Sequence, residues 1–105
     1  MTESVDKRTG QMKVVALSGG VGGGKLAYGL YHAMPYENLT VIVNIGDDFE
    51  HFGLKICPDI DSVLYALAEK NDPIRGWGLA DETWETSSAL EELGAPTWFQ
   101  LGDKD

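Results

Sequence analysis

The sequence lacks several features that would place it in common protein classes. It contains a single cysteine, Cys57, so no disulfide can form within the chain, which fits a reducing cytoplasm. Basic residues are scarce: 8 Lys and Arg stand against 17 Asp and Glu, giving a formal net charge of -9. Such a balance repels nucleic-acid phosphates and argues against DNA or RNA as a partner.

Long apolar runs are absent as well. Charged residues or glycine interrupt every hydrophobic stretch, so we expect no membrane span and no membrane partner. Residues 1–11 are polar, lack the apolar core of a signal peptide and are expected to form a flexible N-terminal tail. Hydrophobic residues make up 43% of the chain, an ordinary globular composition. We expect one small folded region over residues 12–105.

Apolar patterns in the first half predict a strand, a helix and a second strand. Residues 13–17 (KVVAL) and 39–44 (LTVIVN) are short apolar runs rich in β-branched residues, typical of buried strands. Between them, residues 25–34 carry apolar side chains on one helical face. A right-handed crossover between two such strands makes them parallel neighbours in one sheet.

The second half shows further element signals. Residues 54–56 predict a short extended piece, and a strong helical stripe follows Pro58, with Asp59 expected as the N-cap. Residues 81–93 predict a weaker helix with acidic residues in its first turn. Residues 97–101 (TWFQL) predict a third strand.

These elements predict an α/β fold. We expect a Rossmann-like arrangement, with a mostly parallel sheet and helices on both faces forming three layers. A sheet of three or four strands leaves edges open and helices half covered. We therefore expect the chain to be a truncated part of a larger domain; a stop codon directly after Asp105 would contradict this.

A glycine-rich turn at residues 18–24 (SGGVGGG) directly follows the first predicted strand. Strand, glycines and helix together turn backbone N–H groups toward an anion, because glycine permits close approach. The P-loop spacing nearly fits, but Leu26 stands where Ser or Thr would hold Mg²⁺. A dinucleotide spacing also fits, but Asn44 replaces the ribose-binding acid, which disfavours an NAD-dependent oxidoreductase. A tight packing turn without a ligand stays open.

Carboxylates gather near the end of the second predicted strand. Asp47 and Asp48 follow Gly46 there, and Asp61 lies in the first turn of the next helix. Ligands of open parallel sheets bind beyond the carboxyl ends of the strands, where the glycine turn also lies. Paired carboxylates beside a phosphate cradle predict a divalent cation, although turn formation explains the pair equally well. His51 is a candidate phosphate or hydroxyl contact, against the commoner role of a packed or surface histidine.

Four segments resemble the 2-phospho-L-lactate transferases of coenzyme F-420 biosynthesis: SGGVGGGKLAYGL, NIGDDFEHFGLKICPDIDSVLYALA, RGWGLADETW and TWFQLGDKD. The similarity covers residues 12–105 but only the N-terminal part of the family's length. It implies a Rossmann-like α/β fold and a guanosine diphosphate ester of lactate or phosphoenolpyruvate as donor. The terminal ribityl hydroxyl of the deazaflavin Fo would attack the phosphorus that bears the acid, with release of GMP and a requirement for Mg²⁺.

The resemblance also assigns roles to residues. Asp47 and Asp61 would bind Mg²⁺ and act in catalysis. The residues that the resemblance implies for substrate binding are Gly19, Gly20, Val21, Gly22, Gly23, Lys25, Asn44, Gly46 and Asp48. The chemistry of the residues, apart from the resemblance, adds Lys25 as a catalytic candidate that stabilises charge on the phosphate and His51 as a substrate contact. The partners would be the guanosine diphosphate ester and Fo, and a homodimer stays open. The alternative is a non-catalytic regulator of the same superfamily that binds nucleotide sugars, since such proteins share the glycine turn and a paired-Asp motif.

Overall fold

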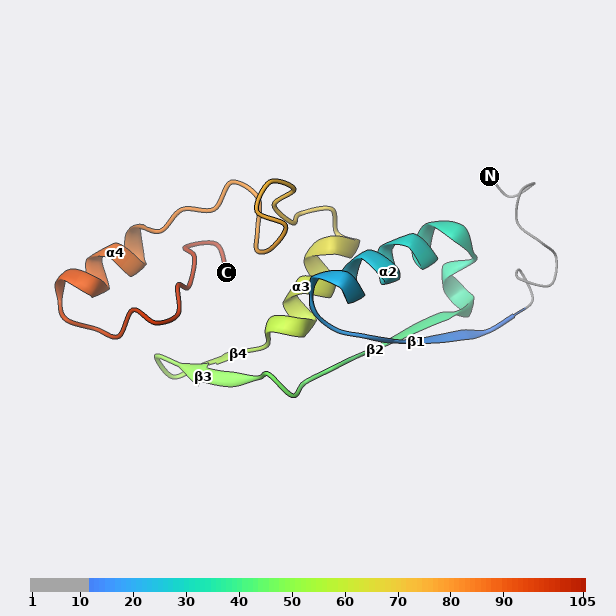
Figure 1. Cartoon of the computed structure of the whole chain (residues 1–105), viewed down its shortest axis with the longest axis horizontal. Coiled ribbons are helices and arrows are strands. Elements are labelled where there is room, and N and C mark those ends of the chain that lie inside the picture. The colour runs from blue at the N-terminus through green and yellow to red at the C-terminus, as the bar shows by residue number, and fades with distance from the viewer. Residues whose placement is uncertain (1–11) are drawn as a thin grey trace.

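The computed structural model describes residues 12–105, so the tail expected at residues 1–11 lies outside the described residues. The chain is elongated, with extents of 59 × 26 × 17 Å (Figure 1). Its elements in chain order are β1 (Val14–Ser18), α2 (Gly20–Ala33), the 3-10 helix η2 (Tyr36–Asn38), β2 (Leu39–Val43), β3 (Phe49–His51), β4 (Leu54–Ile56), α3 (Pro58–Leu67) and α4 (Glu85–Glu92).

The first half is the expected β–α–β unit. Strands β1 and β2 pair in parallel, from Val14 opposite Leu39 to Ser18 opposite Val43. Helix α2 crosses between them, and α3 packs beside it on the same side of the sheet (Figure 1). The α/β class and the parallel strand pair are therefore confirmed.

The two faces of this sheet differ in their cover. Ala16 and Ser18 are buried on the face that carries α2 and α3. On the other face Val15, Leu17 and Ile42 are 61%, 77% and 53% exposed. Within residues 12–105 each sheet has only two strands, and helices cover one face of the parallel pair. The described residues thus supply two of the three expected layers, because one β–α–β unit and α3 cannot cover both faces.

Helix α2 begins at Gly20, five residues before the predicted start at residue 25. The prediction of a glycine loop up to residue 24 was wrong because it ignored packing between helices. A Cβ on Gly24 would lie 3.2 Å from both the Cβ of Ala66 and the carbonyl oxygen of Ser62 on α3. The missing side chain lets α2 approach α3 closely, and this approach favours helical backbone through the glycines.

A short antiparallel hairpin links the parallel unit to α3. Phe49 of β3 pairs with Ile56 of β4, which confirms the extended piece predicted at residues 54–56. Phe52 and Gly53 form the turn with φ angles of 51° and 75°. Two consecutive positive φ values match the twist of hairpin strands, and glycine adopts one of them without strain.

Helix α3 matches the prediction, with Pro58 at its first turn. Its N-cap, however, is Cys57 rather than Asp59, and no side chain caps the helix. Asp59 is buried and its Oδ2 accepts a hydrogen bond of 3.3 Å from Asn44 Nδ2. The N-cap prediction was wrong because the helix starts at Pro58, two residues earlier than an N-cap at Asp59 requires, and Asp59 instead faces the end of β2.

The region after α3 contains less regular structure than predicted. The third strand expected at residues 97–101 is absent; instead the rings of Trp98 and Phe99 pack against Phe49, with centroids 5.3 and 5.0 Å away. Ring contacts hold this segment, although Trp98 stays 70% exposed, and no strand edge in the described residues pairs with it. The helix expected over residues 81–93 is confined to α4, because Asp81 has a φ of 58° and breaks its start.

A candidate phosphate-binding rim and a neighbouring cavity

The ends of β1 and β2 form a rim organised by Asn44. Its backbone N–H donates to the carbonyl oxygen of Ser18 over 2.9 Å. Its side chain uses both ends of the amide: Oδ1 accepts from the N–H of Gly46 at 3.1 Å, and Nδ2 donates to Asp59. Asn44 thus ties the glycine turn, the loop after β2 and the start of α3 together.

The glycines of the turn serve two different needs. A Cβ on Gly19 would lie 3.3 Å from Asn44 Cβ, and one on Gly23 would lie 2.5 Å from Ser18 Oγ. Packing therefore favours glycine at these two positions, which agrees with the alternative of a tight turn without a ligand. Gly22 is different, because a Cβ there would meet nothing within 4 Å. Packing offers no reason for glycine at this exposed helical position, where it costs about 0.5–1 kcal/mol relative to alanine.

The first turn of α2 presents free donors at the rim. The first intrahelical hydrogen bond runs from the Gly23 N–H to the Gly19 carbonyl oxygen, at 3.1 Å. The N–H groups of Gly20, Val21 and Gly22 therefore have no acceptor within the helix. The first turn has no acidic residue, so its positive helix dipole is not offset by a side chain on the helix. Such a terminus attracts anions.

Lys25 lies one turn further along α2 and is exposed. Together with Val21 it borders a hollow of only about 30 Å³, which is shared with Gly76 and Trp77. The predicted catalytic lysine therefore flanks the helix terminus and faces the loop that follows α3.

Two of the predicted carboxylates influence each other. Burial raises the pKa of Asp61, and the negative charges of Asp105 and Asp48 raise it further. Asp48 Oδ1 is buried and has no hydrogen-bond partner within residues 12–105. Burial and a hydrogen bond to Asp48 raise the pKa of the Cys57 thiol. Asp48 and Asp61 thus lie in one negative environment at the start of α3.

Asp47 is exposed in the turn that follows Gly46. It is Asp48, not Asp47, whose charge contributes to the raised pKa of Asp61. Over residues 12–105 the structure contains no group of three or more His, Cys, Asp or Glu arranged to hold a metal ion. A cation here would need further ligands from a substrate or water, which is the usual way in which proteins bind Mg²⁺.

His51 lies on the hairpin. It is buried among aromatic rings, with centroids 4.1 Å from Phe52, 5.4 Å from Trp98 and 5.5 Å from Phe99. Its Nε2 is buried without a partner among the described residues. This position matches the packed role, which was one of the two roles that the sequence allowed for His51; the other was a contact to substrate.

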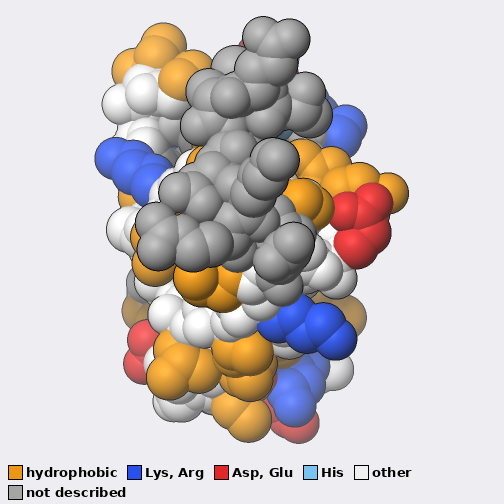
Figure 2. Space-filling view, turned by 90° about the vertical axis from the view of Figure 1, so that its right-hand side faces the viewer, with side chains coloured by type: hydrophobic (Ala, Val, Ile, Leu, Met, Phe, Trp, Pro, Cys, Tyr) orange, Lys and Arg blue, Asp and Glu red, His pale blue; other side chains and the backbone are white. Residues whose placement is uncertain are grey.

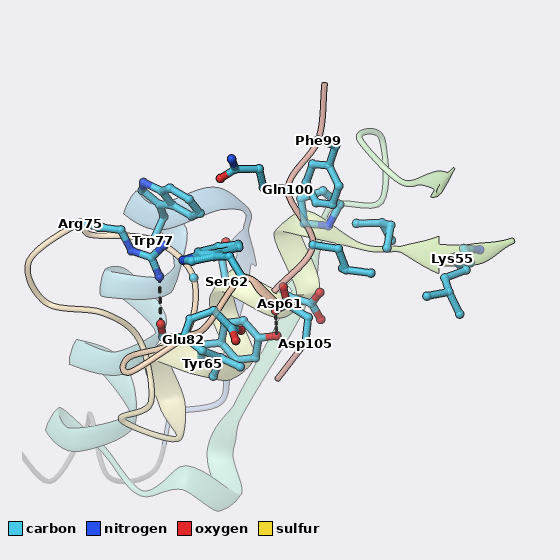
Figure 3. Close-up of a pocket in the computed structure, with 17 residues that line it drawn as sticks. Lys55, Asp61, Ser62, Tyr65, Arg75, Trp77, Glu82, Phe99, Gln100 and Asp105 are labelled. Carbon is cyan, nitrogen blue, oxygen red and sulfur yellow. Dashed lines mark hydrogen bonds between the residues drawn. The ribbon is translucent and has the colours of Figure 1, made fainter. Parts of the chain in front are cut away.

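A cavity of about 510 Å³, which sequence patterns did not predict, lies between α3, the end of the hairpin and the C-terminal region (Figure 3). Its aromatic walls include Trp77 and Phe99. Asp61, Tyr65 and Asp105 lie together on another side, where the Tyr65 hydroxyl donates to Asp105 Oδ1 over 3.0 Å (Figure 3). The only sequence signal for this cavity was the grouping of aromatic residues in RGWGLADETW and TWFQL. Sequence patterns do not show that these segments fold against Asp61.

Arg75 holds the loop that forms one wall of this cavity. Its Nε donates to Asp72 Oδ2 at 2.9 Å, and a terminal nitrogen donates to the Leu79 carbonyl at 3.0 Å. The guanidinium also lies 4.3 Å from the ring centroid of Trp77 and 5.2 Å from that of Trp84. Such contacts between a cation and aromatic faces hold the tryptophans in position.

Comparison with known proteins connects this rim to a family. The model of the family described as 2-phospho-L-lactate transferase CofD matches residues 14–95. This chain belongs to the 2-phospho-L-lactate transferase family. The resemblance found in the sequence is thereby confirmed, and the matched residues include the glycine turn, the rim and α3.

Curated relatives of this 2-phospho-L-lactate transferase family member carry the name phosphoenolpyruvate transferase. The protein from Kitasatospora aureofaciens is 48% identical over 96 residues, which cover 90% of this chain and 30% of the relative. That from Streptomyces coelicolor is 47% identical over 95 residues, with the same two coverages. That from Mycobacterium marinum is 46% identical over 106 residues, covering 90% of this chain and 32% of the relative. The chain thus spans about 30% of the length of these relatives.

Within residues 12–105, every helix is too short or too polar to cross a membrane.

Proposed function

We propose that the protein transfers a 2-phospholactyl or phosphoenolpyruvyl group from a guanosine diphosphate ester to Fo, with release of GMP, in coenzyme F-420 biosynthesis. Family membership and the names of the curated relatives support a transferase of this kind. The observation that carries the proposal is the shared rim: the free N–H groups of α2 and the carboxylates near Asp48 lie at the ends of the same two strands.

In this proposal the first turn of α2 binds the diphosphate of the donor. The N–H groups of Gly20, Val21 and Gly22 supply hydrogen bonds, and open space at Gly22 admits the phosphate oxygens close to the backbone. Lys25 adds positive charge beside the terminus. Phosphoryl transfer depends mostly on positioning and on stabilising charge on the phosphate oxygens, so these groups suit it.

A divalent cation fits the charges of the rim. Asp59 Oδ1 would lie 3.4 Å from a Cβ on Gly19, which puts a carboxylate beside the proposed diphosphate site. Asp61 and Asp48 add more negative charge, and Asp48 Oδ1 has no hydrogen-bond partner among the described residues. Asp47 and Asp61 would hold Mg²⁺, with Asp48 orienting them. When bound, Mg²⁺ would neutralise charge on the diphosphate and lower its repulsion from these carboxylates.

The cavity beside Asp61 is the proposed site for Fo. Its volume lies within the ~300–1,000 Å³ typical of sites for small molecules. Trp77 and Phe99 offer aromatic faces to a flat ring, and the carboxylate of Asp105 offers acceptors to a polyol. In the proposed step the ribityl hydroxyl gives up its proton to solvent while its oxygen bonds to the phosphorus that bears the acid; the bond from this phosphorus to the GMP oxygen breaks, and GMP leaves.

The decisive assay measures GMP formation by the full-length protein from the donor ester, Fo and Mg²⁺. We expect Asp47→Asn to lower turnover by about 100-fold or more, because it removes charge that positions the metal and phosphate. Glu91→Gln on exposed α4 is the matched control and should leave turnover unchanged. Undiminished GMP release by Asp47→Asn would exclude the metal role, whereas binding of a UDP-sugar without GMP release would favour the regulatory alternative.

A further inference from the structure

Ser18, the last residue of β1, has a polar side chain without a visible purpose. The residue is 8% exposed, and its Oγ is buried with no hydrogen-bond partner in the described part of the chain. Its backbone is bound, because its carbonyl oxygen accepts from Asn44. Buried hydroxyls are nearly always hydrogen-bonded, since leaving one unsatisfied costs stability. Alanine would satisfy every packing demand visible at this position.

The hydroxyl is directed at the first turn of α2. A Cβ on Gly23 would lie 2.5 Å from Ser18 Oγ and 3.2 Å from the Ser18 carbonyl carbon. Glycine at position 23 therefore keeps room for the hydroxyl beneath this turn. The N-cap residue Gly19 has no side chain that could cap the helix. The nearest hydroxyl along the chain is that of Ser18, two residues before the first free N–H group of α2.

We propose that the Ser18 hydroxyl is a ligand-binding donor that completes the phosphate site at the start of α2. Its hydrogen would be donated to an oxygen of the diphosphate that the N–H groups of Gly20, Val21 and Gly22 bind. The class of ligand is a diphosphate or its nucleoside ester; the choice of a guanosine ester rests on the proposed function. The ligand would supply the hydrogen bond that the buried hydroxyl lacks.

The surrounding charges explain why a neutral donor is useful here. Asp59 Oδ1 would lie 3.8 Å from a Cβ on Gly20, so a carboxylate borders the same turn. A neutral hydroxyl donor binds a phosphate oxygen and leaves the Asp59 carboxylate free to accept the hydrogen bond from Asn44.

The test compares Ser18→Ala with the wild type and with Ser88→Ala, an exposed serine on α4, in the full-length protein. Binding of GDP and of inorganic pyrophosphate is measured by calorimetry in the presence of Mg²⁺, and the unfolding midpoint is measured without ligand. We expect Ser18→Ala to weaken both ligands by about tenfold or more, as for a hydrogen bond to a charged group. Its midpoint without ligand should equal or exceed that of the wild type, because an unsatisfied hydroxyl is removed.

Ser18→Cys is the second variant, since it keeps the size of the side chain but is a poor donor. Equal binding of both ligands by either folded variant would overturn the proposal, and so would a lower midpoint in both variants, which would show a structural role. If the wild type binds pyrophosphate but not GDP, the proposed guanosine ester is wrong. The pyrophosphate affinities of the variants would then still test the role of Ser18. A wild type that binds neither ligand would refute both.

Discussion

The two halves of the molecule are held together in different ways. All the buried hydrophobic residues of the described chain precede residue 70: Ala16, Ala27, Met34, Ile56 and Val63. The region after residue 70 is instead held by ring contacts and by hydrogen bonds to charged side chains, such as those of Asp72 and Asp103. The proposed phosphate rim thus lies on a packed core, and the proposed Fo cavity depends on a polar, more exposed region.

The strongest test of this contrast is Met34→Ala. Met34 is buried behind the C-terminus of α2, and its truncation should lower the free energy of unfolding by about 2–5 kcal/mol. Leu93→Ala removes a similar side chain from the end of α4, where Leu93 is exposed, and should change the free energy of unfolding by less than about 0.5 kcal/mol. Chemical denaturation of the two full-length variants measures both values, and equal losses would remove the proposed distinction.

Asp103 should control order in the second region. Its carboxylate accepts hydrogen bonds from Thr83 Oγ1 at 2.6 Å and from the N–H groups of Glu85 and Thr86 at 3.0 Å, which caps α4 from a distant part of the chain. Asp103→Ala should therefore raise amide hydrogen exchange at the start of α4 and leave that of α2 unchanged. Asp103→Asn keeps an acceptor oxygen and should retain most of the protection.

The same residue gives this region a dependence on pH. The hydrogen bond from Thr83, together with those from Thr86, lowers the pKa of Asp103 below its ordinary value of 3.8. A lowered pKa means that the stabilisation is complete above 3.8 and is lost as the pH falls through the lower folded value. Protection at Glu85 and Thr86 should thus fall below about pH 4 in the wild type, and this titration should be absent in Asp103→Asn. Protection that stays constant on acidification would contradict the capping role.

The smallest effect is expected at the rim itself. Gly22→Ala places a methyl group where nothing lies within 4 Å, and it should stabilise the ligand-free protein by about 0.5–1 kcal/mol because alanine favours helices. The same methyl group should weaken diphosphate binding by obstructing the open side of the turn. Gly29→Ala is the matched control, since it also meets nothing within 4 Å but lies at the far end of α2. Equal GDP affinity of both variants would place the phosphate elsewhere.

Sequence patterns predicted the elements whose signals are local. The β-branched runs predicted β1 and β2, and the helical stripe after Pro58 predicted α3. The start of α2 was wrong because it depends on Gly24 meeting Ser62, a contact between distant residues. The TWFQL segment reads as a strand by composition, but rings from the hairpin hold it and no strand edge pairs with it.

The site divides along the same line. Position after a strand end predicted that the loop after β2 shares a rim with the glycine turn, and Asn44 does lie beside Gly19 there. The buried role of Asp59 was missed because an aspartate at the start of a helix is typical of an N-cap. Its actual partner, Asn44, lies 15 residues earlier in the chain. The cavity was missed because its walls come from segments as far apart as Leu54 and Asp105.

The bare face of the β1–β2 pair has a practical consequence. Val15, Leu17 and Ile42 form a flat apolar surface on two adjacent strands, and hydrophobic side chains also reach the surface at the end of the molecule nearest η2 (Figure 2). Uncovered surfaces of this kind promote self-association in water. Residues 12–105 expressed alone would therefore be prone to precipitate at the concentrations that calorimetry needs, and solubility should be judged before any lack of ligand binding.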